Sequence, residues 1–302
     1  MKRLFTLTLA AFIAVSAMAQ SLNCGSYNIR MHSKVDYKRG DGWTERRQIM
    51  CDLVAFTAFD IFGAQEVCHD QLQYMLERLP EYDYIGVARD DGKTKGEYSP
   101  VFYRRDRFVL LDSGTFWLSE TPDEVSYGWD AACRRVCSWG YFKDKQTKKK
   151  FWFFNTHMDH KGKAARVEGA KLVISKIKQM CGDKANVILT GDFNVAQDSP
   201  AYNTFAQSGL LQDAYTLAPI KHAPAGTFNN FKVGTHSPKR IDHIFVAGCD
   251  VARYGILTYH YWSDNNGTDT KLNDAPTGLT AEHRGVHMHS DHYPVQVFVN
   301  LK

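Results

Sequence analysis

The sequence lacks the features that would divide it into parts or place it in a membrane. No linker rich in Pro, Gly or Ser, no low-complexity tract and no internal repeat interrupts its 302 residues. Beyond residue 19, no apolar run approaches the roughly 20 residues that a membrane-spanning helix needs. We therefore expect residues 20–302 to form one globular domain with no transmembrane segment, a length that a single α/β domain can reach.

A surplus of charge of one sign is also missing. The chain has 37 Lys and Arg against 33 Asp and Glu, and Lys2 and Arg3 supply two of its four net positive charges. A protein that holds long nucleic acid mainly by its phosphates usually has a clearer basic bias. The basic run KDKQTKKK over residues 143–150 lies between two aromatic-rich strand candidates. A solvated hairpin turn is favoured there over a patch that follows phosphates.

The cysteines have neither the number nor the spacing of a disulfide framework. There are seven, at positions 24, 51, 68, 133, 137, 181 and 249. An odd number leaves at least one thiol unpaired in a monomer, and no pair is spaced like a zinc site. Several lie in apolar surroundings, so we expect mostly buried thiols. Cys133 and Cys137 could form a bridge only if the local backbone allowed it.

The amino terminus is the one long apolar stretch, and it is typical of a secretory signal peptide. Lys2 and Arg3 precede an apolar run over residues 4–15, and Ala17-Met18-Ala19 offers the small residues that signal peptidase recognises. We predict removal of residues 1–19 and export to the periplasm or the extracellular medium. A membrane anchor is the alternative, but the run is short for it. No convincing lipoprotein pattern precedes Cys24.

The rest of the chain alternates between short apolar strands and amphipathic helices. Hydrophobic periodicity predicts helices over residues 44–59, 71–79 and 163–180. Strands are predicted at 22–29, 60–65, 82–87, 99–103, 108–115, 136–143, 151–156, 187–190, 241–246, 251–257 and 294–299. Adjacent strands with helices between them favour an α/β fold in which two mixed sheets pack together and helices flank them.

Polar side chains recur where the predicted strands end. These positions carry Asn28, Glu66, His157, Asp159, Asp192, Asn194, Asp242, Asp291 and His292. A single acid at a strand end is usually a turn or cap residue, but a sheet brings its strand ends together. A cluster of carboxylates would repel itself unless a cation lay among them. Oxygen ligands without a thiolate favour Mg²⁺, Mn²⁺ or Ca²⁺ over zinc.

Six sequence blocks together resemble the endonuclease/exonuclease/phosphatase superfamily. They are SYNIR (26–30), AQEV (64–67), NTHMDH (155–160), TGDFN (190–194), RIDHIF (240–245) and SDHYPV (290–295). They follow the order of that family from the first predicted strand to the last. The resemblance implies the DNase I-like four-layered sandwich and metal-dependent hydrolysis of phosphoesters. The residues in these blocks are most similar to those of the branch that contains deadenylases and nocturnin, and to those of secreted bacterial relatives.

The resemblance also implies a role for each core residue. Glu66 is expected to be the principal metal ligand, and Asn28 and Asp291 are expected to complete or support the site. Mg²⁺ or Mn²⁺ is the implied ion, with Ca²⁺ as a further candidate. The metal would polarise the phosphate and stabilise the leaving oxygen.

The remaining polar residues of the six blocks are expected to carry out catalysis. His292 would take a proton from the attacking water, and Asp242 would hold its imidazole in the required tautomer. Asp192 and Asn194 would position the nucleophile and the scissile phosphate. His157 would donate hydrogen bonds to a phosphoryl oxygen, where charge develops in the transition state.

Four further residues are weaker candidates for substrate contact. Arg135 precedes a strand, so a phosphate contact and a surface ion pair are both open. Arg166 could reach the site from the start of its helix, although a salt bridge on the helix surface is its default role. The Tyr103 hydroxyl could touch phosphate, but packing is favoured. Asp159 and the neighbouring His160 are expected to orient His157.

The segment that leads into the last block is unusual. His287 and His289 would share one face of an extended chain and could add ligands, although solvent exposure is favoured. Residues 263–282 are long, polar and rich in Asp, Asn, Thr and Gly. Loops of this kind beside a site commonly set substrate choice.

Several functions remain open on the sequence. The expected substrates are an oligonucleotide, as for a 3′–5′ RNA exonuclease, a phospholipid head group, as for a sphingomyelinase, or a sugar or inositol phosphate. Near-neutral charge and the lack of an apolar hairpin disfavour long nucleic acid and lipid. No obligate protein partner is indicated. The alternatives are a non-catalytic binding module on the same fold and an unrelated protein that binds metal through its twelve histidines, which are scattered.

Overall fold

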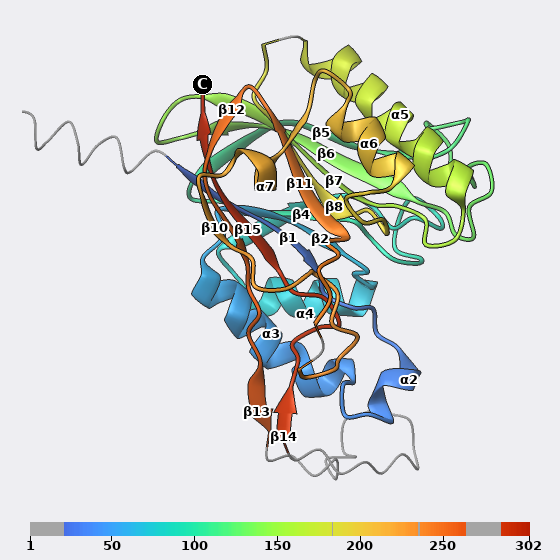
Figure 1. Ribbon diagram of the computed structural model, residues 1–302, viewed down its shortest axis with the longest axis vertical. Helices are drawn as coiled ribbons and strands as arrows, with labels where there is room; N and C mark the ends of the chain where they lie inside the picture. Colours follow the sequence, from blue (N-terminus) through green and yellow to red (C-terminus); the bar gives the residue numbers. More distant parts are fainter. Residues whose placement is uncertain (1–20, 183, 235, 264–284) are drawn as a thin grey trace, which may run out of the picture.

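The computed structural model describes residues 21–302 except 183, 235 and 264–284. Its centre is two β-sheets that pack face to face (Figure 1). The first sheet has the order β10 (Ile220–His222), β12 (Cys249–Ile256), β15 (Val295–Leu301), β1 (Leu22–Asn28), β2 (Ile61–Gln65), β4 (Val101–Arg104) and β3 (Tyr82–Ile85). The second has the order β5 (Phe108–Trp117), β6 (Val136–Asp144), β7 (Lys150–His157), β8 (Val187–Asp192), β11 (Asp242–Ala247) and β9 (Gln212–Asp213).

Helices cover the outer face of each sheet and complete four layers. On the seven-stranded sheet lie α3 (Trp43–Thr57) and α4 (His69–Arg78), and on the six-stranded sheet lie α5 (Lys163–Cys181) and α6 (Pro200–Ala206). The short helices α2 (Lys34–Tyr37) and α7 (Ala214–Leu217) and the hairpin of β13 (Tyr261–Ser263) and β14 (Gly285–His287) complete the described elements. The predicted α/β fold, the DNase I-like four-layered sandwich, is confirmed.

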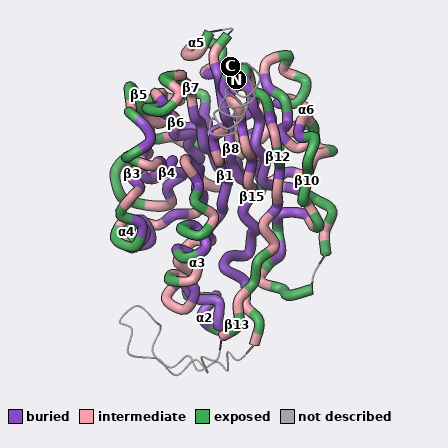
Figure 2. The backbone as a smooth tube through the Cα atoms, turned by 90° about the vertical axis from the view of Figure 1, so that its left-hand side faces the viewer, coloured by how far each residue is buried: buried purple, intermediate pink, exposed green. Residues whose placement is uncertain are grey.

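Three apolar cores hold the layers together, as the buried strands in Figure 2 indicate. One core lies between the sheets, and the other two lie under the helices on either side. The strands therefore face apolar layers on both sides, which explains their nearly continuous apolar sequence. β2 and β8, for example, are buried at every position.

Both sheets combine parallel and antiparallel pairs. β1 pairs parallel with β2 and antiparallel with β15, and β7 pairs parallel with β8, which pairs antiparallel with β11. The carboxyl ends of β1, β2, β7 and β8 therefore point the same way within their sheets, toward the start of β11 and of β15. This mixed topology collects polar side chains at one edge of the sandwich.

Several smaller expectations are confirmed. Residues 143–150 include a hairpin turn between β6 and β7. All seven cysteines are free thiols, of which Cys24, Cys51, Cys137 and Cys249 are buried, so Cys133 and Cys137 form no bridge. No helix in the described part of the chain is both long and apolar enough to cross a membrane. The predicted signal peptide and residues 264–282 of the polar segment lie outside the described residues.

Candidate active site

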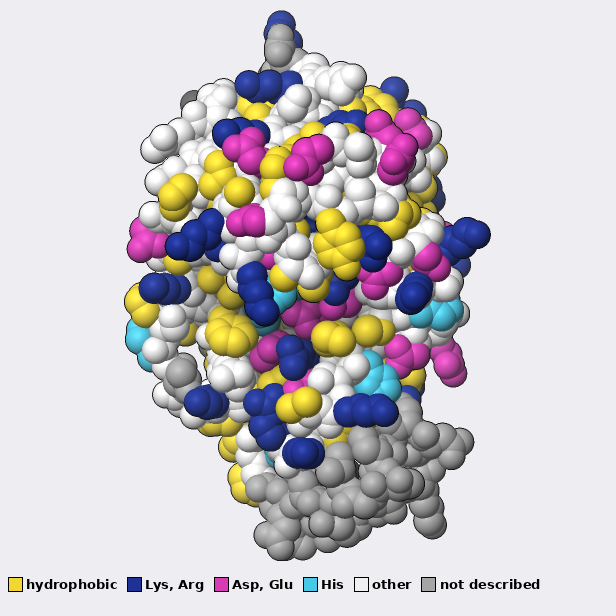
Figure 3. Space-filling model, turned by 90° about the vertical axis from the view of Figure 1, so that its right-hand side faces the viewer, with side chains coloured by type: hydrophobic (Ala, Val, Ile, Leu, Met, Phe, Trp, Pro, Cys, Tyr) yellow, Lys and Arg dark blue, Asp and Glu magenta, His cyan; other side chains and the backbone are white. Residues whose placement is uncertain are grey.

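Six of the nine predicted strand-end residues line one cavity of about 530 Å³: Glu66, His157, Asp192, Asn194, Asp291 and His292. Asn28 and Asp242 are hydrogen-bonded to them. The register of the second sheet places Asp192 directly beside both His157 and Asp242. In the first sheet, Asn28 lies opposite Gln65, so the next residue, Glu66, leaves β2 at the same edge. Figure 3 looks onto a face of the molecule where acidic side chains lie in a hollow surrounded by Lys and Arg.

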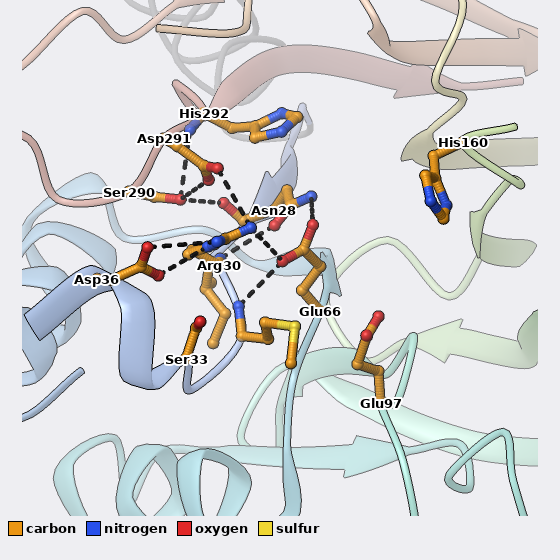
Figure 4. A network of polar contacts seen from close by, with 12 residues as sticks. Asn28, Arg30, Ser33, Asp36, Glu66, Glu97, His160, Ser290, Asp291 and His292 are labelled. Carbon is orange, nitrogen blue, oxygen red and sulfur yellow. Dashed lines mark hydrogen bonds and ion pairs between the residues drawn. The ribbon is translucent and has the colours of Figure 1, made fainter. Parts of the chain in front are cut away.

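Asn28 links the two sheets at the base of this cavity. Its Nδ2 donates to Glu66 Oε1 at 3.0 Å and to Asp192 Oδ2 at 2.9 Å. The second Glu66 oxygen accepts a hydrogen bond from the backbone N–H of Met31 at 3.0 Å. Glu66 has φ of 61°, in the left-handed region that side chains rarely adopt. The end of β2 thus turns sharply to aim this carboxylate into the cavity, as Figure 4 shows.

His292 and Asp242 form a buried pair. Nδ1 of His292 lies 2.8 Å from Asp242 Oδ2, and its other ring nitrogen lies 3.8 Å from Asp192 Oδ2. Burial alone would lower the pKa of His292, but the carboxylates of Asp242 and Asp192 outweigh it and raise this pKa well above its ordinary value. The edge of the Phe228 ring packs against the imidazole. The arrangement fixes the tautomer and leaves Nε2 facing the cavity.

His157 and Asn194 form the facing wall. Asn194 Nδ2 lies 3.0 Å from His157 Nε2 and donates to the Met158 carbonyl at 2.9 Å, while its backbone N–H donates to Asp192 Oδ1 at 2.8 Å. Burial, together with the positive charge of Arg135, lowers the pKa of His157 well below its ordinary value. His157 is therefore neutral, with Nδ1 3.8 Å from Glu97 Oε2.

Asp291 completes the cluster from the segment before β15. Its Oδ2 lies 3.7 Å from Arg30 Nη1, and the same nitrogen lies 3.8 Å from Glu66 Oε2. Ser290 Oγ donates to the carbonyl of Asn28 at 2.7 Å, which ties this segment to the end of β1. Figure 4 shows Glu66 and Asp291 on two sides of the Arg30 guanidinium.

These side chains fit a hard divalent cation. Burial raises the pKa of Asp192 to about 7, with the Asp242 charge adding to it, and burial also raises the pKa of Asp291. Burial is the larger cause of both shifts, and the neighbouring carboxylates of Asp242 and Glu66 add to them, whereas hydrogen bonds and nearby positive charge lower the pKa of Glu66 against its burial. Ligand atoms of Glu66, His157 and Asp192 lie within 4.8 Å of one another, as do those of Asp192, Asp242 and His292. Carboxylate oxygens of this kind suit Mg²⁺, Mn²⁺ or Ca²⁺.

The four weaker candidates fall in different places. Arg135 lines the cavity, with Nε 3.4 Å from Asp159 Oδ2 and Nη2 3.0 Å from His160 Nδ1. Asp159 lies behind it and accepts hydrogen bonds from the backbone at the start of α5. Arg166 donates to the Asp159 carbonyl at 2.8 Å and is not among the residues that line the cavity.

Tyr103 lies away from the cavity. Its ring packs in the core between the sheets, 5.0 Å from the ring of Phe142. Of its two alternatives, packing is the one that the structure supports. His287 and His289 do not line the cavity either: His287 Nδ1 lies 3.4 Å from Asp41 Oδ1, and His289 is 6 % exposed, so solvent exposure is wrong for it. Burial lowers the pKa of His289 to about 4.

Eight residues that line the cavity were not predicted as site residues: Arg30, Met31, Arg89, Glu97, Cys133, Phe228, Asn230 and Ile241. Arg89 and Glu97 form a two-pronged ion pair with both N···O distances at 2.7 Å. They come from the turns between β3 and β4, and Phe228 comes from the loop before β11, where no strand end marks a polar residue. Arg30 differs, because it belongs to the SYNIR block and could have been predicted from it.

Comparison with known proteins agrees with this geometry. Residues 25–292 match the Endonuclease/Exonuclease/phosphatase family. The chain belongs to this family.

Individual relatives span bacteria and vertebrates. A mannosyl-6-phosphatase of Bacteroides thetaiotaomicron is 47% identical with a TM-score of 0.85, over 92% of this chain and 99% of that one. An endonuclease/exonuclease/phosphatase of Bacteroides vulgatus is 37% identical with a TM-score of 0.80, over 93% and 99%. Nocturnin of Xenopus laevis is 24% identical over 76% of this chain and 59% of its own length. The predicted family resemblance, which included nocturnin and bacterial relatives, is confirmed.

Proposed function

We propose that this chain is a divalent-metal-dependent phosphoester hydrolase, and specifically a phosphomonoesterase that acts on a phosphorylated sugar. One observation supports the reaction class: His292, which pairs with Asp242 at 2.8 Å, lines the same cavity as the carboxylates of Glu66 and Asp291. A general base and a cation site on one cavity are what hydrolysis of a phosphoester needs. The similarity to a mannosyl-6-phosphatase supports the sugar phosphate.

In this proposal, His292 Nε2 takes the proton of the attacking water. Asp242 accepts a hydrogen bond from the Nδ1–H of His292 and keeps the ring oriented. Burial opposes the raised pKa of His292, which the carboxylates of Asp242, Asp192 and Asp291 cause. Asp291 belongs to the proposed metal site, so a cation bound there would offset its share of this effect and favour the uncharged ring that a base requires. Mg²⁺ or Mn²⁺ held by Glu66, with Asn28 and Asp291 in support, would stabilise charge on the phosphoryl and leaving oxygens.

The other wall binds the phosphoryl group. His157 Nδ1 has no hydrogen-bond partner and supplies the donor, while Asn194 holds the ring by donating from Nδ2 to His157 Nε2, and Asp192 fixes Asn194 through its backbone N–H. Arg135, 5 % exposed and held by Asp159, adds a positive charge beside them. Donors fixed before the reaction stabilise developing charge without reorganising. Arg166, which holds the Asp159 carbonyl, acts in this proposal only through that residue.

Alternative substrates remain as outcomes of the test. The similarity to nocturnin supports an oligonucleotide, which the near-neutral charge disfavours. A phospholipid head group and a non-catalytic binding module have no observation in their favour in the described residues. Export after removal of residues 1–19, a single domain over residues 20–302 and the lack of an obligate protein partner stay predictions.

The decisive experiment measures hydrolysis with Mg²⁺ and then with Mn²⁺, as release of inorganic phosphate from monoesters and as release of the alcohol from diesters. The panel contains mannose 6-phosphate, inositol phosphates, oligoribonucleotides, sphingomyelin and bis-p-nitrophenyl phosphate. We expect the highest kcat/KM for the sugar phosphate, and His292→Ala should lower it by about 10²- to 10⁴-fold. His222→Ala, on an exposed strand, is the matched control. Hydrolysis of diesters alone would contradict the monoesterase, and undiminished turnover by His292→Ala would contradict the assigned base.

A further inference from the structure

Arg30 places a fixed positive charge in the cavity. Its guanidinium lies among the carboxylates of Asp36, Glu66 and Asp291 (Figure 4). The side chain is 25 % exposed and lines the cavity beside His292. Arg30 is therefore within reach of a ligand that fills this space.

The backbone of Arg30 is held in an unusual conformation. Its φ is 60°, a value that costs energy for a residue with a side chain. Its N–H donates to Asn28 Oδ1 at 3.0 Å. Its carbonyl accepts hydrogen bonds from Arg46 Nη2 at 2.7 Å and from Gln71 Nε2 at 2.9 Å. Arg46 and Gln71 are both fully buried, so the backbone at this position is rigidly placed.

The side chain is anchored by a single carboxylate. Nε and Nη2 of Arg30 donate to the two oxygens of Asp36 at 2.9 and 3.3 Å, and Asp36 is only 1 % exposed. These two parallel hydrogen bonds occupy one edge of the guanidinium and fix the orientation of its plane. The remaining nitrogen, Nη1, points toward Glu66 and Asp291 at 3.8 and 3.7 Å. Those distances are ion pairs without hydrogen bonds, so the Nη1 donors stay available to a ligand oxygen.

The three arginines of the cavity are not equivalent. Both terminal nitrogens of Arg89 are engaged by Glu97 at 2.7 Å. Arg135 is shared between Asp159 and His160. Arg30 alone among these three stands beside both Glu66 and Asp291, the proposed metal site. Its charge therefore acts where the phosphoryl group would be bound.

A fixed cation at this point distinguishes two kinds of phosphoester. A phosphomonoester carries a charge of nearly −2 above its second pKa of about 6, whereas a diester carries −1. The attraction to a guanidinium grows with the charge of the ligand. The monoester therefore gains more from Arg30 than the diester does.

We propose that Arg30, positioned by Asp36, is a specificity-determining residue that selects dianionic phosphomonoesters over monoanionic phosphodiesters. This inference rests on the proposed function and names the residue that sets its substrate class. Asp36 acts as a positioning residue, since its carboxylate is buried and reaches the ligand only through the guanidinium.

The test compares p-nitrophenyl phosphate with bis-p-nitrophenyl phosphate at about pH 8, where the monoester is a dianion. Arg30→Gln keeps length and polarity but removes the charge. It should lower kcat/KM for the monoester on the order of 10- to 100-fold and that for the diester at least about tenfold less. Arg30→Lys should recover part of the selectivity. Asp36→Asn should shift the ratio in the same direction by a smaller factor.

Arg39→Ala is the matched control. Arg39 Nη2 lies 2.6 Å from the same Asp36 carboxylate, but Arg39 does not line the cavity. This variant should leave the ratio of the two kcat/KM values unchanged. Competitive inhibition by inorganic phosphate provides a readout that does not depend on ester turnover, and Arg30→Gln should weaken it.

Three outcomes would overturn the inference. An equal fold loss of kcat/KM on both esters would assign Arg30 to general stabilisation of the site, and unchanged kcat/KM values for both would exclude any role in selection. Failure of Arg30→Gln to fold, measured by circular dichroism, would assign Arg30 to the fold. Hydrolysis of neither ester by the wild-type protein would instead contradict the proposed function itself.

Discussion

Neighbouring residues of β11 show how a site and a core share one strand. Asp242 contacts His292 in the cavity, whereas His243 faces the opposite side and packs against Phe193 and Tyr202. Successive side chains of a strand point to opposite faces, so adjacent titratable residues acquire opposite environments. The RIDHIF block contains both Asp242 and His243. Only the alternation of side chains along the strand shows which of them faces the site and which faces the core.

The buried histidine makes the stability of the fold depend on pH. Burial lowers the pKa of His243, so the folded state disfavours the proton that the unfolded chain accepts near its ordinary pKa of about 6.5. The contribution of the neutral His243 to the stability of the fold is complete above this ordinary pKa. It is lost as the pH falls below it. Between about pH 7 and about pH 5.5, it should lower the free energy of unfolding by at most about 1.4 kcal/mol per pH unit.

Urea unfolding at several pH values checks this prediction. His243→Gln can still donate to the Val195 carbonyl, which His243 Nε2 contacts at 3.0 Å, but it cannot be protonated. We expect a smaller pH dependence in this variant than in the wild type. The exposed His222→Gln is the control for losing a histidine. Identical slopes for His243→Gln and wild type would contradict the account.

At the scale of elements, a layer of buried polar groups links the two sheets beside the cavity. Gln65 Nε2 donates to Asn155 Oδ1 at 2.7 Å, and Thr190 Oγ donates to the same oxygen at 3.1 Å. Asn155 Nδ2 donates to the Ala64 carbonyl at 2.7 Å. The network joins β2 to β7 and β8 just before the residues that enter the cavity. Gly63 makes this contact possible, because a Cβ there would overlap Asn155 and Thr190.

Gly63→Ala should therefore destabilise the fold. A buried overlap of this kind typically costs about 1–3 kcal/mol, since both partners belong to strands that cannot move independently. Gly255→Ala is the control, because the nearest atoms to a Cβ there lie at an ordinary 3.8 Å. Urea denaturation should show a lower midpoint for Gly63→Ala only. Equal midpoints for the two variants would mean that the sheets are free to adjust.

The long elements could be predicted from the sequence, and the short ones could not. The helices expected over residues 44–59, 71–79 and 163–180 agree with α3, α4 and α5 to within two residues at either end. Their own periodicity specifies them. The elements α2, α6, α7, β9, β10, β13 and β14 were missed, because strands of two or three residues and helices of four to seven carry too little pattern. Such elements form where tertiary contacts hold them.

The candidate site was predictable to the same degree and for a related reason. Residues at strand ends, such as Asp192 and Asp242, are placed by sheet register, which the apolar pattern encodes. Glu97 and Arg89 reach the cavity along a path of turns, which no local pattern specifies. Arg166 and Tyr103 were plausible by spacing, but the structure directs one to the Asp159 carbonyl and the other into the core.

At the scale of the whole molecule, the sandwich serves to concentrate charge. Residues from Asn28 to His292, at opposite ends of the described chain, meet because β1 pairs with β15 and the two sheets share one edge. The result is a cavity beside which several carboxylates are buried, and this burial is the main cause of the raised pKa values of Asp192 and Asp291. The central claim is that a hard divalent cation completes this arrangement.

Calorimetric titration of Mg²⁺ into the wild type and Glu66→Gln tests that claim most directly. Glu66→Gln keeps the side-chain shape and removes one charge, and Glu168→Gln on the surface of α5 is the matched control. The wild type and the control should bind, and Glu66→Gln should bind at least about tenfold more weakly, as expected when a ligand charge is lost. A saturating ion at about 100 Kd should also stabilise the wild type by about 2.7 kcal/mol. No detectable binding by the wild type, or equal affinity in Glu66→Gln, would contradict the account.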